Sequence, residues 1–299
     1  MKAMRSLGAH RGVTLVELMI SMAIGLVVVG AVLVSFVGSG KAGRYQTALS
    51  QMNQDAQVGL NLLAREVQMA GYVSPGQTLG APAIFGCDST RSGTVSPFTS
   101  PQAPGAMSCM PWTADSVSAL EVVYEADTLT TVPNGAGAPS DCLGNGITAT
   151  SPGFFVTRNR YHIKANVNSR RNELQCSSPA GPATQPLIEN VEDMQLWYGV
   201  ASAATPDVVV RYARAGRDAS TPDTVNALGA AEWGNVNSVR ICLLMRSAEP
   251  VLTSEDTAAT ATPNYLGCNG LQVPYPPGDY FLRRAYFTTA MVRTKMAKY

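Results

Sequence analysis

The sequence predicts an α+β protein in which a long N-terminal helix precedes a β-rich domain with an antiparallel sheet and long loops. Three observations predict this class. An apolar run of membrane length lies near the start of the chain, a helical stripe of apolar residues follows it, and strand-like segments separated by stretches rich in Gly and Pro occupy the remainder. Because no second helical pattern follows the first, we expect the strands to form a sheet that packs across the helix.

The apolar run extends from Val13 to Val37 and contains a single charged residue, Glu17. As a helix it would be about 37 Å long, which exceeds the roughly 30 Å hydrocarbon thickness of a bilayer. The leader before it carries Lys2, Arg5 and Arg11. These charges favour a cytoplasmic N-terminus and place the rest of the chain outside the cytoplasm. The alternative is a cleaved secretory signal peptide, but its apolar core spans only about 7–15 residues.

A helical stripe continues beyond the apolar run. Apolar or small residues recur three or four positions apart at Leu49, Met52, Ala56, Leu60, Leu63, Val67 and Ala70. This spacing marks one face of an amphipathic helix, and Gly71 provides a C-terminal stop. Gly38, Gly40 and Gly43 weaken the middle of the helix and leave room for a kink. We expect the stripe to pack on the globular part of the same chain, with a coiled-coil dimer as the alternative.

The chain from Tyr72 to Tyr299 is predicted to consist mainly of strands. The candidate strands are Val117–Glu125, Gly153–Arg158, Tyr161–Val167, Val191–Val200, Val208–Tyr212, Val236–Arg246 and Tyr280–Val292. Alternation in one of them gives a buried face made of Val239, Ile241, Leu243 and Met245. Stretches rich in Gly, Pro, Ser and Thr are expected to be loops, at 92–106, 133–140 and 177–186.

Six cysteines follow the apolar run, at Cys87, Cys109, Cys142, Cys176, Cys242 and Cys268. None of them forms a C-x-x-C pair, which argues against a zinc site. An even number of cysteines in a region placed outside the cytoplasm predicts three disulfides. Many pairings are possible, and we prefer neighbour pairing because each pair then encloses one hairpin or loop. The preferred pairs are Cys87–Cys109, Cys142–Cys176 and Cys242–Cys268.

Residues with catalytic or metal-binding chemistry are sparse in this sequence. The chain has 22 basic and 21 acidic side chains, so it lacks the large excess of positive charge that is typical of nucleic-acid-binding proteins. It has two histidines, and His162 lies in a strand-like segment where we expect a packing or surface role. No phosphate loop or calcium-binding loop of the EF-hand type is present. We therefore predict no catalytic residues, no cofactor, no metal site and no enzymatic activity, and we do not expect nucleic-acid binding.

Two groups of charged residues invite a functional interpretation but have simpler ones. Paired acids occur at Glu121 and Glu125 and at Glu192 and Asp193, and we expect them on solvated strand faces. Basic residues gather near the C-terminus at Arg283, Arg284, Arg293, Lys295 and Lys298. We expect the latter to protect an exposed strand edge, with contact to DNA or an acidic partner as the alternative.

Gly12 followed by VTLVELMISMAI resembles the signal of type IV prepilins, in which a glycine and an aromatic residue precede TLIELM. Val13 stands where most members have phenylalanine. The resemblance implies cleavage by a prepilin peptidase between Gly12 and Val13, methylation of the new N-terminus at Val13, and docking to a neighbouring subunit through Glu17. It also implies the pilin fold, in which a long helix packs on an antiparallel sheet.

Later stretches, including PLIENVEDMQLWYGV, VNSVRICLLMRS and FLRRAYFTTAMVRTK, are similar to the PilW group of minor pilins. The implied function is structural: a minor pilin that primes or caps a type IV pilus. The implied partners are other minor pilins, the major pilin and a tip adhesin. A pseudopilin of the large minor class in a type II secretion system is the first alternative, and a pilus-borne subunit that binds DNA or a surface is the second.

The expected organisation of the chain follows from these patterns. A prepilin leader occupies residues 1–12, a membrane-spanning and filament-core helix 13–37, and its amphipathic continuation 38–71. A disulfide-bearing β-rich head occupies residues 72–299. Before assembly we expect a single-pass inner-membrane protein with its head in the periplasm, and after assembly a subunit at the pilus tip on the cell surface.

Overall fold

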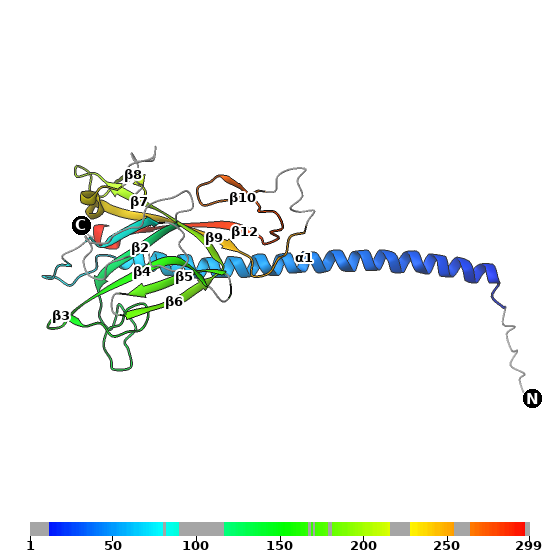
Figure 1. The fold of residues 1–299 in the computed structure, drawn as a ribbon, viewed down its shortest axis with the longest axis horizontal. Helices are drawn as coiled ribbons and strands as arrows, with labels where there is room; N and C mark the ends of the chain where they lie inside the picture. Colours follow the sequence, from blue (N-terminus) through cyan, green and yellow to red (C-terminus); the bar gives the residue numbers. More distant parts are fainter. Residues whose placement is uncertain are drawn as a thin grey trace, which may run out of the picture. The chain divides into compact units, whose positions relative to one another are not determined.

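The computed structural model describes residues 12–79, 82–89, 117–166, 169, 171–178, 181–215, 228–253 and 264–296. The chain forms two compact units that divide between Thr47 and Ala48. The described residues contain one long helix and two main antiparallel sheets (Figure 1). The predicted α+β class is therefore confirmed, with the difference that the strands are shared between two sheets.

Helix α1 extends from Leu15 to Met69, beginning in the first unit and ending in the second. The helix is continuous through Gly38, Gly40 and Gly43, so it has no break at the glycines where the sequence leaves room for a kink. The helix ends where the sequence predicts. Gly71 adopts a left-handed conformation with φ of 74°, and the N–H of Tyr72 donates to the carbonyl of Met69 at 3.0 Å. Glycine is favoured at this position because it has no Cβ to oppose a positive φ.

The larger sheet has the strand order β1-β2-β4-β5-β6 in the described part of the chain, with β3 beside β4. All neighbouring strands in it are antiparallel. Its strands are β1 (Ile84–Ser89), β2 (Val117–Glu125), β3 (Ala149–Ser151), β4 (Phe154–Asn166), β5 (Arg171–Ser178) and β6 (Gly181–Glu189). Consecutive strands are mostly neighbours, as expected where short connections join antiparallel strands.

The second sheet has the order β12-β9-β7-β8 and is also antiparallel. Its strands are β7 (Val191–Ala201), β8 (Val209–Ala213), β9 (Val236–Arg246) and β12 (Arg283–Met291). The chain passes from β6 in the first sheet to β7 in the second through Asn190, whose φ is 60°. Asparagine tolerates this left-handed conformation better than most residues with a side chain.

The remaining elements in the described part of the head are short. A hairpin is formed by β10 (Asn264–Leu266) and β11 (Gln272–Pro274). The 3-10 helix η2 (Ala230–Asn235) precedes β9, and the one-turn helix α2 (Arg293–Met296) follows β12.

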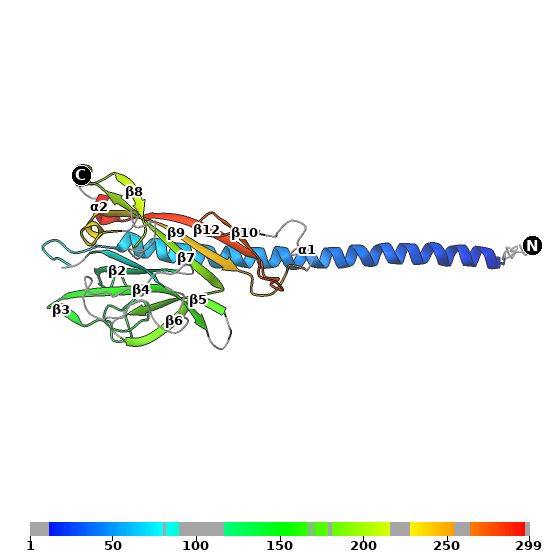
Figure 2. The same ribbon diagram turned by 45° about the horizontal axis from the view of Figure 1, so that its top comes forward.

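The C-terminal part of α1 packs along the strands of both sheets (Figures 1 and 2). Its buried stripe comprises Met52, Ala56, Leu60, Leu63, Val67 and Ala70, with Leu49 partly buried. At Gly59, a Cβ would lie 3.0 Å from Leu243 Cδ1 on β9 and 3.4 Å from Ile188 Cγ1 on β6. The helix therefore contacts both sheets, and the predicted stripe packs on the head of its own chain.

Strand β9 shows how the two faces of the second sheet are used. The alternating residues predicted to be buried, from Val239 to Met245, belong to the main core beneath α1. On the other face, Cys242 and Leu244 form a smaller buried cluster with Cys268, partly covered by Trp197. Leu244 interrupts the apolar–polar alternation because both faces of this strand are covered.

Several predicted segments differ from the structure. The stretch 177–186 is wrong as a loop, since it contains the end of β5 and much of β6, which pair with each other. Strand β6 lies at the edge of its sheet, where a proline such as Pro186 is tolerated because fewer ladder hydrogen bonds are required. The two strands predicted at 153–158 and 161–167 are one strand, β4. The stretch 133–140 is a loop as predicted, and 92–106 lies outside the described residues.

Gly86 on β1 allows the two sheets to lie close together, because it has no side chain. Its replacement by alanine tests how much the stability of the head depends on this close packing. A Cβ at this position would overlap the hydroxyl of Tyr198 and lie 3.1 Å from the carbonyl oxygen of Ala119. Tyr198 is fully buried, with its ring edge-on to Trp233 at a centroid distance of 4.9 Å, so it has little room to move. Gly86→Ala should destabilise the head by about 1–3 kcal/mol through overpacking.

Chemical denaturation of Gly86→Ala and of the unmodified chain, under the same conditions, measures this loss of stability. Gly135→Ala is the matched control, because nothing lies within 4 Å of a Cβ there. Equal denaturation midpoints for Gly86→Ala and the unmodified chain would contradict the predicted overlap.

Candidate assembly segment and head pocket

The N-terminal segment begins α1 with a side-chain cap. The Oγ1 of Thr14 accepts a hydrogen bond from the backbone N–H of Glu17 at 3.2 Å. Threonine at this position satisfies one of the free N–H groups of the first turn, and Glu17 lies in that turn as its acidic residue. Gly12 and Val13 lie just before this capping threonine. The sequence signal for this cap is the T-x-x-E spacing of Thr14 and Glu17.

The first half of α1 exposes apolar side chains on every side. Exposed fractions reach 77% at Leu15 and at Phe36, and no residue of the most apolar stretch is buried. By length and composition, this is the one helix in the described part of the chain that is able to cross a membrane. A helix that is apolar all round requires lipid or protein around it.

Two disulfides link distant parts of the head. Cys142 bonds to Cys176 on β5, and Cys242 on β9 bonds to Cys268. These are two of the three pairs preferred from the sequence. Cys87 is also disulfide-bonded, while Cys109 lies outside the described residues.

The acidic residues expected on solvated strand faces are instead buried or paired, and that expectation is wrong. Glu121 is fully buried and forms an ion pair with Arg160 at 2.6 Å. Glu125 is also buried and accepts hydrogen bonds from the N–H and hydroxyl of Ser74. These partners come from other parts of the chain, so the sequence around each glutamate does not reveal them.

One residue of the second acidic pair, Glu192, contacts one of the C-terminal basic residues, Arg283. Glu192 forms ion pairs with Arg283 at 2.5 Å and with Arg246 at 3.5 Å. Arg283 is buried, so the expected exposure of its charge is wrong, although β12 does lie at a sheet edge. Arg284 is exposed as expected. Lys298 lies outside the described residues.

His162 is a packing residue on β4. Its side chain is buried, with 1% exposed. Burial, together with the nearby charges of Lys164 and Arg160, lowers the pKa of His162 to about 4. It is therefore a neutral side chain at physiological pH. No cluster of three or more His, Cys, Asp or Glu suited to a metal ion occurs among the described residues.

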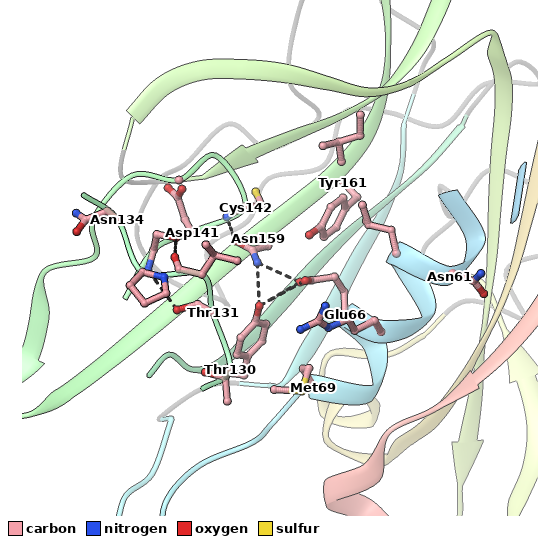
Figure 3. A pocket seen from close by; sticks show the side chains of 18 residues that line it. Asn61, Glu66, Met69, Thr130, Thr131, Asn134, Asp141, Cys142, Asn159 and Tyr161 are labelled. Atoms are coloured by element: carbon pink, nitrogen blue, oxygen red, sulfur yellow. Dashed lines mark hydrogen bonds between the residues drawn. The ribbon is translucent and has the colours of Figure 1, made fainter. Parts of the chain in front are cut away.

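A pocket of about 580 Å³ opens between the C-terminal part of α1 and the loop that follows β2. Its walls combine apolar side chains, such as Leu62, Met69 and Val132, with polar ones, such as Thr131 and Asp141. Figure 3 shows Glu66, from α1, pointing toward Asn159 on β4 among the residues that line the pocket. No local sequence pattern predicts this pocket, because its walls come from segments far apart in the chain.

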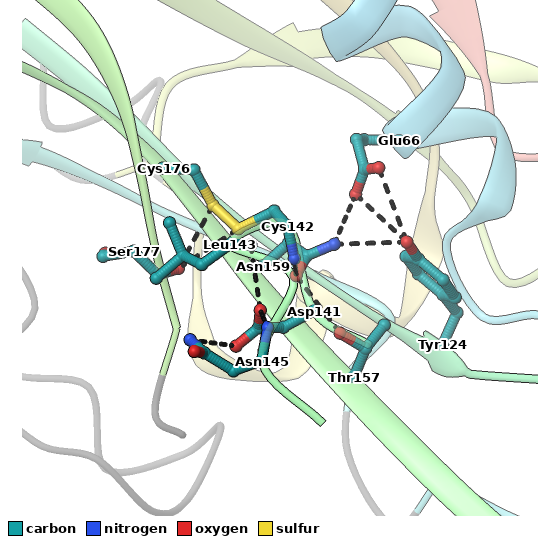
Figure 4. Close-up of a disulfide and its surroundings, with 10 residues drawn as sticks. All are labelled: Glu66, Tyr124, Asp141, Cys142, Leu143, Asn145, Thr157, Asn159, Cys176 and Ser177. Carbon is teal, nitrogen blue, oxygen red and sulfur yellow. Dashed lines mark hydrogen bonds between the residues drawn. A yellow bond between two sulfur atoms is a disulfide. The ribbon is translucent and has the colours of Figure 1, made fainter. Parts of the chain in front are cut away.

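A hydrogen-bond network fixes the polar end of the pocket (Figure 4). Nδ2 of Asn159 donates to Oε2 of Glu66 at 3.0 Å, and the hydroxyl of Tyr124 donates to the same carboxylate at 3.4 Å. Burial raises the pKa of Glu66, and hydrogen bonds from Asn159, Tyr161 and Tyr124 oppose that rise, with a smaller opposing effect from Arg65. The pocket thus holds a carboxylate that neutral donors orient.

Comparisons with known proteins address the identity of the chain. Residues 160–294 match the family described as type IV pilus-assembly protein W, and residues 8–33 match the prokaryotic N-terminal methylation motif. Among solved structures, a type IV-like pilin from Thermus thermophilus aligns with a TM-score of 0.39 and 15% identity, covering 85% of this chain and 98% of that chain. No curated protein matches this chain. Over residues 8–33 the chain is thus similar to type IV pilins, and over residues 160–294 it is similar to the PilW group of pilus-assembly proteins.

Proposed function

We propose that this protein is a minor pilin that primes or caps a type IV pilus from a tip complex. The observation that carries the proposal is the combination of a methylation motif at residues 8–33 with a helix half that is apolar on every side. Such a helix is suited first to a membrane and then to a filament core, where other helices replace the lipid. The match to the pilus-assembly protein W family supports the narrower role.

Within this proposal, each part of the N-terminal segment has a role. A prepilin peptidase cleaves between Gly12 and Val13, which removes the leader 1–12 and leaves Val13 to be methylated. Residues 13–37 anchor the chain in the inner membrane, with the head 72–299 in the periplasm, and later enter the filament core. Glu17, the single charge in the apolar run, meets the freed N-terminus of an adjoining subunit. That pairing offsets the cost of a carboxylate in apolar surroundings.

The size of the head favours an end of the filament over its shaft. Residues 72–299 make up most of the chain, and a wide subunit repeated along a shaft would crowd its neighbours. A few copies at one end avoid this crowding. At that end, the apolar helix offers a ready surface for the first contacts with other minor pilins, the major pilin and a tip adhesin.

Deletion of the gene tests the priming role. The number of filaments should fall sharply, while the amount of major pilin in the membrane stays near normal, because priming affects initiation and not subunit supply. Electron microscopy counts the filaments, and quantitative mass spectrometry of sheared pili gives the ratio of this chain to the major pilin. Wild-type filament numbers, or near-equal copies in the shaft, would contradict the proposal. Loss of secretion with normal pili would instead favour the type II secretion alternative.

Replacement of Glu17 by alanine tests the docking role. We expect Glu17→Ala to leave head stability unchanged and to ease membrane insertion, because it removes a charge that costs up to about 2.5–3.5 kcal/mol in a bilayer. Co-purification with other pilins from detergent extracts should fall strongly. Glu17→Asp is the matched control, since it keeps the charge. Unchanged co-purification of the alanine variant would rule out docking through this residue.

A further inference from the structure

The pocket beside α1 has the composition of a binding site with one polar end. Its volume of about 580 Å³ falls within the range of roughly 300–1,000 Å³ typical of small-molecule sites. Met69 and Leu62 on α1 and the exposed Val132 on the opposite loop form apolar walls. The carboxylate of Glu66 lines the same pocket and points toward Asn159 (Figure 3). This arrangement suits a group with an apolar stem and a polar tip.

The negative charge of Glu66 indicates that the polar tip of the bound group is a cation. Two carboxylates buried in the head have an arginine partner, since Asp88 pairs with Arg214 and Glu121 pairs with Arg160, whereas buried Glu125 accepts hydrogen bonds from the neutral Ser74. Glu66 has no ion-pair partner among the described residues, and its hydrogen bonds come from the neutral side chains of Asn159, Tyr124 and Tyr161. A cation in the pocket would supply the missing partner, since a carboxylate with accepting lone pairs binds charged donors most strongly.

The pocket is organised before any ligand arrives. The backbone N–H of Cys142 donates to Oδ1 of Asn159 at 3.0 Å, and the hydroxyl of Thr157 donates to the same oxygen at 3.1 Å. Two donors on the oxygen fix the orientation of the amide, so its NH₂ group must face Glu66. The disulfide from Cys142 to Cys176 ties this loop to β5 (Figure 4). The loop, the amide and the carboxylate therefore hold their geometry together.

We propose that this pocket binds an alkylammonium or alkylguanidinium group, with the cation at Glu66 and the alkyl stem against Met69, Leu62 and Val132. The same chemistry is carried by small organic amines and by the lysine and arginine side chains of a partner protein. Arg65 lies at the exposed rim of the pocket and opposes cation entry, which limits the affinity. The proposal stands apart from the filament role, because none of the pocket residues belongs to the apolar segment 13–37.

Titration of the full-length, detergent-solubilised protein tests this proposal. The probes are butylammonium and butylguanidinium, a peptide with one central lysine, and butyrate as a matched anion. Isothermal titration calorimetry measures affinity. We expect the cationic probes to bind and butyrate not to bind. If the small cations bind, a free alkylammonium or alkylguanidinium ion is a sufficient ligand. If only the lysine peptide binds, the site is assigned to the side chain of a partner protein. Failure of every cationic probe, or equal binding of butyrate, would overturn the proposal.

Three variants locate the binding at Glu66. Glu66→Gln should weaken cation binding by roughly tenfold or more, the value typical of a lost charge-assisted hydrogen bond. Arg65→Gln should strengthen binding several-fold by removing the opposing charge, and it keeps the test decisive if Glu66→Gln folds poorly. Asp55→Asn, on the same helix but outside the pocket, should change nothing. Cation binding that survives Glu66→Gln, or that is lost in Arg65→Gln, would contradict the assignment.

Acidification provides an independent readout. The ionisable groups around Glu66 are Arg65 on α1, Tyr124 on β2, Tyr161 on β4 and Asp141 in the loop. Burial raises the pKa values of both tyrosines, so they stay neutral at and below physiological pH. Because burial also raises the pKa of Glu66, its carboxylate takes up a proton sooner than an exposed glutamate as pH falls. Cation affinity should therefore be lower at about pH 5 than at about pH 7, and an affinity that rises on acidification would contradict the role of Glu66.

Discussion

Replacement of Gly12 by leucine is expected to leave this chain uncut and to remove it from filaments almost completely. Under the proposed processing, the peptidase cleaves directly after Gly12, and only the smallest side chain fits the site at that point. An uncut chain keeps Lys2, Arg5 and Arg11 in front of the apolar run. Those charges hold the N-terminus in the cytoplasm, so it is not free to enter a filament core.

Mass spectrometry of the membrane-extracted protein measures this effect. The unmodified chain should begin at Val13 and carry one additional methyl group, whereas Gly12→Leu should retain Met1 or the residue after it. Gly25→Leu is the matched control: it changes a glycine inside the apolar run, where nothing lies within 4 Å of a Cβ. A Gly12→Leu chain that still begins at Val13 would refute the cleavage position. A first residue beyond Val37 in the unmodified chain would refute prepilin processing altogether.

Replacement of Asp88 by alanine is expected to produce the largest loss of head stability, about 3–5 kcal/mol. The carboxylate of Asp88 is fully buried and binds the Nε and Nη2 atoms of Arg214 at 3.0 and 3.2 Å. It also accepts a hydrogen bond from Ser118 at 2.6 Å. The guanidinium of Arg214 is itself mostly buried, so without Asp88 it would be a charge in an apolar interior that lacks its counterion.

Two further variants distinguish the cost of leaving a buried charge unpaired from the cost of losing an ion pair. Glu249→Ala removes the partner of Arg171 in a pair whose side chains are 78% and 30% exposed, and it should cost less than about 1 kcal/mol. The double variant Asp88→Leu with Arg214→Met should recover much of the stability, because it removes both charges and fills the space with apolar atoms. Denaturation curves compare the four proteins. If Asp88→Ala and Glu249→Ala cost the same, burial does not determine the strength of this pair.

The elements that the sequence predicts well are those whose signal is local. The stripe from Leu49 to Ala70 repeats with the helical period, and six of its seven members are buried against the head. Strands β2 and β9 have the predicted bounds because each is a run of β-branched and aliphatic residues with polar flanks. Gly71 ends α1 as predicted, because a residue in the left-handed conformation stops a helix wherever it occurs.

The elements that the sequence analysis missed depend on neighbours that are distant in the chain. Strand β6 contains Pro186 and lacks clear alternation, and it is a strand because β5 offers it a hydrogen-bonding edge. The two faces of β9 are both covered because the disulfide to Cys268 brings a hairpin onto the outer face. In each case, the free energy gained from contacts with distant segments outweighs the weak conformational preference of the local sequence.

The candidate sites divide in the same way. The N-terminal segment is readable from the sequence because Gly12, Val13 and Glu17 are consecutive or nearly so, and because an apolar run of membrane length needs no tertiary context. The pocket is not readable, because Glu66 and Asn159 lie 93 residues apart and meet only when β4 packs beside α1. The sequence alone therefore determined the anchor, the helix stripe and the class of the fold, since these follow from local period and composition. Only the tertiary structure decided which buried charges are paired and which carboxylate faces a cavity, since both depend on burial and on partners that the fold brings together.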